Sequence, residues 1–131
     1  MSGRKTAKLL LQLAANDLSA VGAMAKDTGF SEETFGFHAQ QAVEKALKAW
    51  LSDHDIVYPR IHTLETLAQQ LNENGLQFPA QFETLLSLSP FAARLHYDLW
   101  QPPTGEPLDR VELARLAEEL LAFVKDQTGL T

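Results

Sequence analysis

Four polar side chains of one predicted helix have the types and spacing that could bind an anion. They lie within residues 35–51 (FGFHAQQAVEKALKAWL) and recur along one helical face: His38, Gln41, Lys45 and Lys48. Lysine supplies positive charge, whereas glutamine and histidine supply directional hydrogen bonds, so this polar stripe can hold a phosphate or a nucleobase. The alternative is an ordinary solvated face in which Glu44 pairs with Lys48 at i, i+4 spacing and Gln41 contacts a neighbouring helix.

A second candidate anion site is the connector around Arg60 and His62. Both residues come just before Thr63, which we expect to cap the next helix, and helix N-termini favour anions. In the alternative, His62 binds a backbone carbonyl and holds the connector in place. At this stage we favour the structural role for His62.

The densest group of reactive side chains is Arg94, His96, Tyr97 and Asp98. The nearby carboxylate of Asp98 could orient His96 as a general base, and Arg94 could clamp a phosphate. These three are weak catalytic candidates. Arg94 and Tyr97 share a face if the segment is helical. In the alternative, Arg94 pairs with an acidic helix and Tyr97 packs under the following loop.

Other chemistries find little support in the sequence. The chain has no cysteine, and its histidines at 38, 54, 62 and 96 lack metal-ligand spacing, so we expect no metal site and no cofactor. A glycine-rich phosphate loop is absent. The net charge of −6 argues against broad nucleic-acid binding. No apolar run reaches the roughly 18 residues that span a membrane, so we expect a cytoplasmic protein without membrane contact.

The elements that must position these residues are helices, because apolar residues recur at three- and four-residue spacing almost throughout. We expect one domain over 1–131 and an all-α fold, an antiparallel up-and-down bundle of four long helices plus a short or kinked fifth. The expected helices are 4–26, 32–53, 64–74, a segment from 79 to 97 that Pro90 kinks or splits, and 109–127.

Local signals mark the expected helix ends. Ser31, Thr63 and Asp109 are predicted N-caps. Gly29 is predicted to be a left-handed cap, and Gly75 is predicted to end the third helix. The two tryptophans differ in setting. Trp50 lies on the apolar side of its helix and should be buried, whereas Trp100 lies in a proline-rich loop and has either an exposed or a folded-back position.

Two strings resemble the HEPN (higher eukaryotes and prokaryotes nucleotide-binding) domain family. They are FHAQQAVEKALKAWL and YPRIHTLETLAQQL, with an Arg-and-Tyr element at 94–97. The matching positions are Phe37, Gln40, Gln41, Ala42, Glu44, Lys45, Leu47, Lys48 and Ala49, then Pro59, His62 and Leu64. The resemblance covers about residues 14–97. It implies a helical bundle, a homodimer, a nucleotide ligand and pairing with a minimal nucleotidyltransferase, in some members as toxin and antitoxin.

Some members of that family are RNases, which carry an arginine, then four to six intervening residues, then a histidine. In this chain the histidine after Arg94 is His96, two positions on, and Leu99 to Gln101 contain none. We therefore expect a non-catalytic domain that binds a nucleotide or a nucleotidyltransferase. Two alternatives stay open: an RNase toxin with an altered Arg/His centre, and a structural helical scaffold.

Overall fold

The computed structural model describes residues 3–60, 63–95 and 107–130, with the backbone alone for 93–95. Within these ranges every regular element is a helix, so the predicted all-α class is confirmed. The elements are α1 (Gly3–Ala25), α2 (Glu32–Asp53), α3 (Leu64–Glu73), the 3-10 helix η1 (Ala80–Leu95) and α4 (Arg110–Thr128). The division into a single domain stays a prediction.

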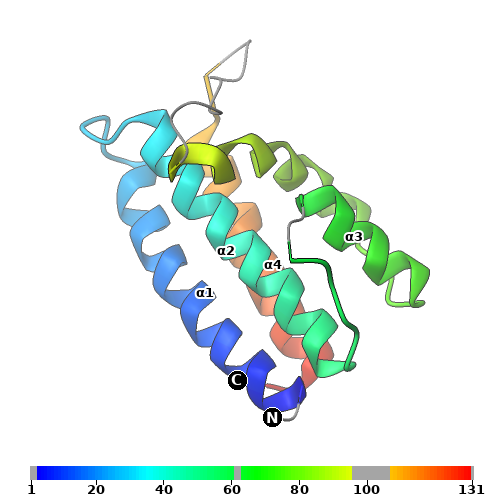
Figure 1. The fold of residues 1–131 in the computed structure, drawn as a ribbon. Helices are drawn as coiled ribbons and strands as arrows, with labels where there is room; N and C mark the ends of the chain where they lie inside the picture. The colour runs from blue at the N-terminus through cyan, green and yellow to red at the C-terminus, as the bar shows by residue number, and fades with distance from the viewer. Residues whose placement is uncertain (1–2, 61–62, 96–106, 131) are drawn as a thin grey trace.

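The helices do not alternate in direction as the sequence analysis expected. Figure 1 shows α1 running opposite to both α2 and α4, while α2 and α4 run the same way. Two stretches without helix make this arrangement possible, because the connector after Asp53 and the segment before η1 carry the chain back along the molecule. The antiparallel up-and-down arrangement of four long helices is therefore not confirmed.

Most of the predicted helix ends are confirmed. A cap bonds to residues close to it in the sequence, so the sequence alone can predict it. Ser31 and Thr63 accept hydrogen bonds from the backbone N–H three residues on, and Asp109 accepts one from Glu112. Gly75 follows the end of α3, as predicted, and it has a left-handed conformation with a φ of 78°. The chain also turns left-handed at Gly129, where φ is 68°.

The prediction of a left-handed cap at Gly29 is wrong. Gly29 is not among the residues with positive φ, and its N–H instead donates to Oδ1 of Asp27 at 2.8 Å. The N–H of Phe30 donates to the carbonyl of Asp27 at 3.3 Å. The aspartate thus organises this turn, which removes the need for a left-handed residue after the helix.

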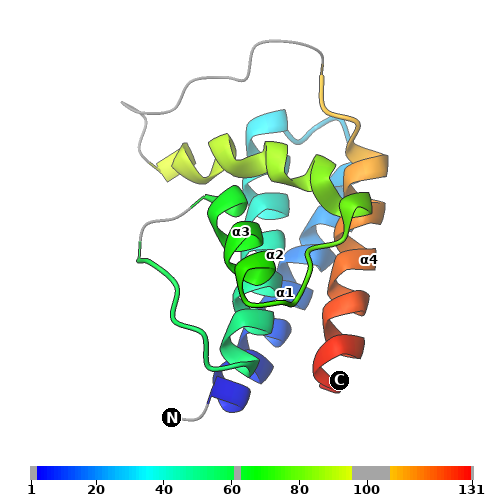
Figure 2. The same ribbon diagram turned by 90° about the vertical axis from the view of Figure 1, so that its right-hand side faces the viewer.

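The segment around Pro90 is one element in the structure, not two. η1 runs unbroken from Ala80 to Leu95 with Pro90 inside it, so the predicted split does not occur. Its 3-10 geometry is unusually long for that helix type. Figure 2 shows η1 crossing over α2 and α4, and its buried side chains Phe82, Leu85, Leu88 and Phe91 cover the core from that side.

The core is built around α2, which contacts each of the other four elements. None of its residues from Glu32 to Asp53 is exposed. Trp50 is 1% exposed and packs edge-to-face on Phe123 of α4, with ring centroids 5.4 Å apart. The prediction that Trp50 belongs to the core is therefore confirmed, and His38, Gln41, Lys45 and Lys48 of α2 are half-buried.

One further finding concerns membranes. In the described ranges, no helix combines the length and apolarity that crossing a bilayer requires.

The contact between Gly36 and Phe91 gives a test of how η1 seats on α2. A methyl group at Gly36 would overlap the Phe91 ring, so Gly36→Ala should lower the free energy of unfolding by about 1–3 kcal/mol. Gly22 is the matched control, because the nearest atom to a methyl group there is 4.0 Å away. Gly22→Ala should stabilise α1 by about 0.5–1 kcal/mol. Urea unfolding measures both, and equal effects would contradict the described packing of η1.

Candidate functional site

The centre of the candidate site is a carboxylate of α1 that faces two donors of α2. Oδ2 of Asp17 accepts a hydrogen bond from Nζ of Lys45 at 2.6 Å, and its Oδ1 lies 3.5 Å from Nδ1 of His38. The Asp17 side chain is 15% exposed and that of Lys45 is 24% exposed. The pair is thus largely removed from water, and it joins α1 to α2.

The remaining residues of the polar stripe form a second chain of contacts along α2. Nε2 of Gln41 donates to Oε1 of Gln40 at 2.7 Å, and Nε2 of Gln40 donates to Glu44 at 3.0 Å. Lys48 closes the chain, because its Nζ donates to Oε2 of Glu44 at 3.2 Å. The expected Glu44–Lys48 pair is therefore present, but Gln41 binds its own helix and not a neighbouring one.

The connector after α2 packs against the end of this chain. Nζ of Lys48 lies 5.4 Å from the centre of the Tyr58 ring, a cation–π distance. The hydroxyl of Tyr58 lies 3.5 Å from Oγ of Ser52. Further along, the carbonyl of Val57 accepts a hydrogen bond from Gln70 of α3 at 3.0 Å. The polar stripe thus ends against an ordered piece of the connector.

The charges of this site balance locally. The lysines of the stripe each face a carboxylate, Lys45 with Asp17 and Lys48 with Glu44. A phosphate that approached them would have to displace or repel those carboxylates. The arrangement is therefore better suited to polar contacts with another surface than to holding a free anion.

Apolar side chains border the site on α1. Leu13 lies one turn before Asp17 on the same flank of the helix, and Leu9 one turn earlier. Leu9 is 51% exposed and Leu13 is 38% exposed, so two large apolar side chains lie one turn apart on the surface of α1. We call the surface formed by Leu9, Leu13, Asp17 and the polar stripe the α1–α2 face.

The other predicted anion site, at the start of α3, has two of its backbone donors engaged. The N–H of Thr66 donates to Thr63, and the N–H of Leu64 donates to Oγ of Ser89 at 3.0 Å. Ser89 in turn donates to the carboxylate of Glu65 at 2.6 Å, which brings negative charge to this helix end. Arg60 is exposed on the connector.

Several predicted site residues fall outside what the structure describes. His62, His96, Tyr97, Asp98 and Trp100 lie outside the described residues. Arg94 belongs to η1, and its side chain is likewise not described. The predictions made for these residues stay predictions.

Sequence reasoning missed the role of Asp17, which holds the site together. The signal was present, because Asp17 interrupts the apolar series Leu10, Leu13, Ala14, Leu18 and Val21 on one side of its helix. An acid in such a series must find a partner when the helix packs. Its partner could not be identified, because Lys45 lies 28 residues further on.

A separate charged cluster lies on the exposed side of α4. Arg115 donates to Glu112, with the Nε contact at 3.0 Å, and to Glu119 at 2.5 Å. The hydrogen bond from Arg115 lowers the pKa of the Glu112 carboxyl, and the same bond raises the pKa of Arg115. These residues are solvated, so the cluster is an ordinary surface network. In the described residues, no three acidic or histidine side chains are grouped as metal ligands.

The described helices form an all-helical structure with an ion pair, Asp17–Lys45, in the seam between the first two helices. Residues 7–127 match the HEPN domain family, so the chain belongs to that family. Comparison with curated proteins and with solved structures finds no significant match.

The Asp17–Lys45 pair gives a second test. Asp17→Asn keeps the shape but leaves the lysine ammonium without its counter-charge, so the free energy of unfolding should fall by about 1–3 kcal/mol. The control is Glu119→Gln on α4, whose carboxylate is 49% exposed. It should change stability by less than about 1 kcal/mol. Urea unfolding at neutral pH compares the two, and an Asp17→Asn protein as stable as the control would show that the seam does not depend on this charge pair.

Proposed function

We propose that this HEPN domain is a non-catalytic binding module whose α1–α2 face docks onto a protein partner, a minimal nucleotidyltransferase. The membership of the HEPN family supports this class of partner. The observation that carries the choice of face is the exposed pair Leu9 and Leu13 beside a balanced polar network. Apolar side chains next to directional polar groups are typical of specific protein interfaces.

Nucleotide binding at the polar stripe is the less supported half of the proposal. It is favoured by the gathering of His38, Gln41, Lys45 and Lys48 on one half-buried face. It is opposed by the carboxylates of Asp17 and Glu44, which already neutralise the two lysines. A phosphate could pair with either lysine only if that lysine released its carboxylate. We therefore favour binding of a protein partner over binding of a nucleotide at this face.

The homodimer and the cytoplasmic location remain predictions. A second copy of the chain is a competing occupant of the α1–α2 face, because the same leucines would suit it. The toxin–antitoxin role depends on the nucleotidyltransferase partner, so it is proposed only together with that partner. Sedimentation of the isolated chain shows whether it forms a dimer, and so tests whether a second copy can occupy this face.

Docking on the α1–α2 face predicts a loss of complex formation when its leucines become acidic. The double variant Leu9→Glu/Leu13→Glu should lower co-purification with the co-expressed nucleotidyltransferase by at least about tenfold, because it removes apolar contact and adds unpaired charge. Val111→Glu on α4 is the control, because Val111 is 60% exposed on another helix. It should leave the complex intact.

Two outcomes of that experiment would overturn the assignment. One is an unchanged complex in the Leu9→Glu/Leu13→Glu protein. The other is a wild-type dimer, seen by sedimentation, that dissociates in the same double variant while nucleotidyltransferase binding persists. That result would assign the face to a second copy of the chain.

The non-catalytic part of the proposal rests on the two-residue spacing from Arg94 to His96. The purified protein should leave structured and single-stranded RNA intact over hours at neutral pH. Cleavage that disappears in an Arg94→Ala/His96→Ala protein would instead favour the altered RNase centre. Cleavage that persists in that variant would indicate a contaminating nuclease and would leave the protein itself without RNase activity.

A further inference from the structure

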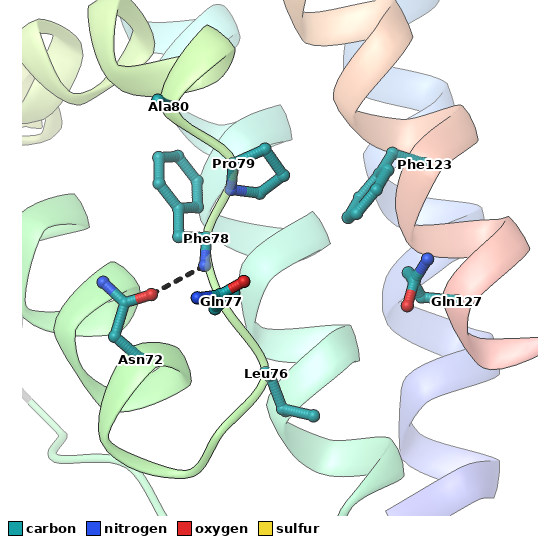
Figure 3. A pocket seen from close by; sticks show the side chains of 8 residues that line it. All are labelled: Asn72, Leu76, Gln77, Phe78, Pro79, Ala80, Phe123 and Gln127. Atoms are coloured by element: carbon teal, nitrogen blue, oxygen red, sulfur yellow. Dashed lines mark hydrogen bonds between the residues drawn. The ribbon is translucent and has the colours of Figure 1, made fainter.

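A pocket of about 690 Å³ lies beside α4, between that helix and the loop before η1. Figure 3 shows Gln77 and Pro79 of the loop pointing toward Phe123 and Gln127 of α4, with the Phe78 ring on the other side of the loop. None of the residues that line this pocket is charged. An uncharged lining gives a partner little electrostatic attraction, so recognition by charge has to use another surface.

A surface with unbalanced charge borders the α1–α2 face at the start of α1. Residues 3–16 of this helix include Arg4, Lys5 and Lys8 and no carboxylate, although the whole chain has a net charge of −6. Arg4 is engaged within the fold, because its Nη1 donates to Oδ1 of Asp53 at 3.1 Å and to the carbonyl of Thr128 at 3.0 Å. Lys5 and Lys8 are both exposed, so the border of the face is positive.

Lys8 differs from the lysines of the polar stripe. Lys45 and Lys48 each lie against a carboxylate, at 2.6 and 3.2 Å. Among the residues that the structure describes, Lys8 has no ion-pair partner. Because no contact within that part of the chain uses its charge, Lys8 can pair with a carboxylate of another protein.

The spacing along this border indicates the shape of the partner. Lys5, Leu9 and Leu13 recur every four residues, so they form one ridge along α1, and Lys8 lies next to Leu9. A ridge of this kind packs into the groove between the side-chain rows of a second helix. The leucines of the ridge need apolar side chains opposite them, whereas the lysines at its end need carboxylates.

We propose that the nucleotidyltransferase partner docks on this ridge through an acidic amphipathic helix. The apolar side chains of that helix pack on Leu9 and Leu13, and its carboxylates pair with Lys8 and Lys5. The polar stripe adds directional hydrogen bonds, with its two lysines already neutralised. This inference rests on the proposed docking at the α1–α2 face, and it adds the sign of the charge that the partner carries there.

Association of the two purified proteins, measured at about 50 and about 500 mM NaCl, tests the charge. Lys8→Glu should weaken binding by about tenfold at the lower salt, mainly through slower association, because a cation that attracts the partner becomes an anion that repels it. The higher salt should reduce this difference to about twofold, since exposed charges are then screened. Lys8→Gln removes the charge without reversing it and should have an intermediate effect.

Lys26→Glu is the matched control. Lys26 is exposed just after the end of α1, about 27 Å beyond Lys8 at a rise of 1.5 Å per residue. The substitution changes the net charge of the chain by the same amount as Lys8→Glu, so it should alter binding by less than about twofold. Both variants should unfold at the same urea concentration as the wild type, because both positions are exposed.

Carbodiimide crosslinking of the same complex locates the acids of the partner. The reagent joins a lysine Nζ to a carboxylate that it contacts, through an amide bond formed with loss of water. Peptide mapping by mass spectrometry should find Lys8 or Lys5 joined to an aspartate or glutamate in an amphipathic helix of the nucleotidyltransferase. Lys26 should not be joined to the partner.

The outcomes separate this inference from the proposed function. If Leu9→Glu/Leu13→Glu abolishes the complex while Lys8→Glu binds like Lys26→Glu, the docking face stands and the acidic partner helix is wrong. Crosslinks to the partner that come from other lysines alone would have the same meaning. If the leucine variant leaves the complex intact, the face itself is wrong and this inference fails with it.

Discussion

A half-buried charge needs a counter-charge close by, and this constraint shapes the polar side of α2. Because α2 contacts all the other elements and exposes none of its residues, its lysines cannot rely on water alone. Lys45 finds Asp17 on α1, and Lys48 finds Glu44 on its own helix. The first pair joins α1 to α2, and Lys48 of the second pair also lies over the Tyr58 ring of the connector.

The same pairing decides what the α2 polar stripe can do. From sequence, four donors on one face fit either an anion site or an ordinary solvated face. In the structure, the carboxylates lie as close to the lysines as a phosphate would, so the donors have little unbalanced charge to offer a free anion. These side chains are still partly exposed, and their hydrogen bonds are directional. A protein partner can therefore be recognised specifically through them, even though they add little electrostatic attraction. The leucines that border the stripe supply the apolar area that such a partner would need.

Sequence alone predicted the features that depend on near neighbours. The caps at Ser31, Thr63 and Asp109 were predictable because a cap and the N–H it binds lie within one turn. The direction of α4 was not, because it depends on how the chain returns through stretches without helix. The pairing of Asp17 with Lys45 was not either, since periodicity shows that an acid faces inward but not which helix will face it. The Gly29 turn failed for a different reason, because the Asp27 side chain replaced the left-handed residue.

The pocket beside α4 is a second feature that the sequence alone could not predict. Gln77 and Phe78 are neighbours in the loop before η1, and Phe123 and Gln127 lie one turn apart on α4, but nothing in the sequence joins the two pairs. What brings them together is the aromatic contact chain from Phe78 through Phe82 and Phe123 to Trp50. That chain ends on the apolar side of α2, whereas the polar stripe occupies its other side. Because one close-packed helix separates the two surfaces, each can be altered by substitutions that leave the other's contacts in place.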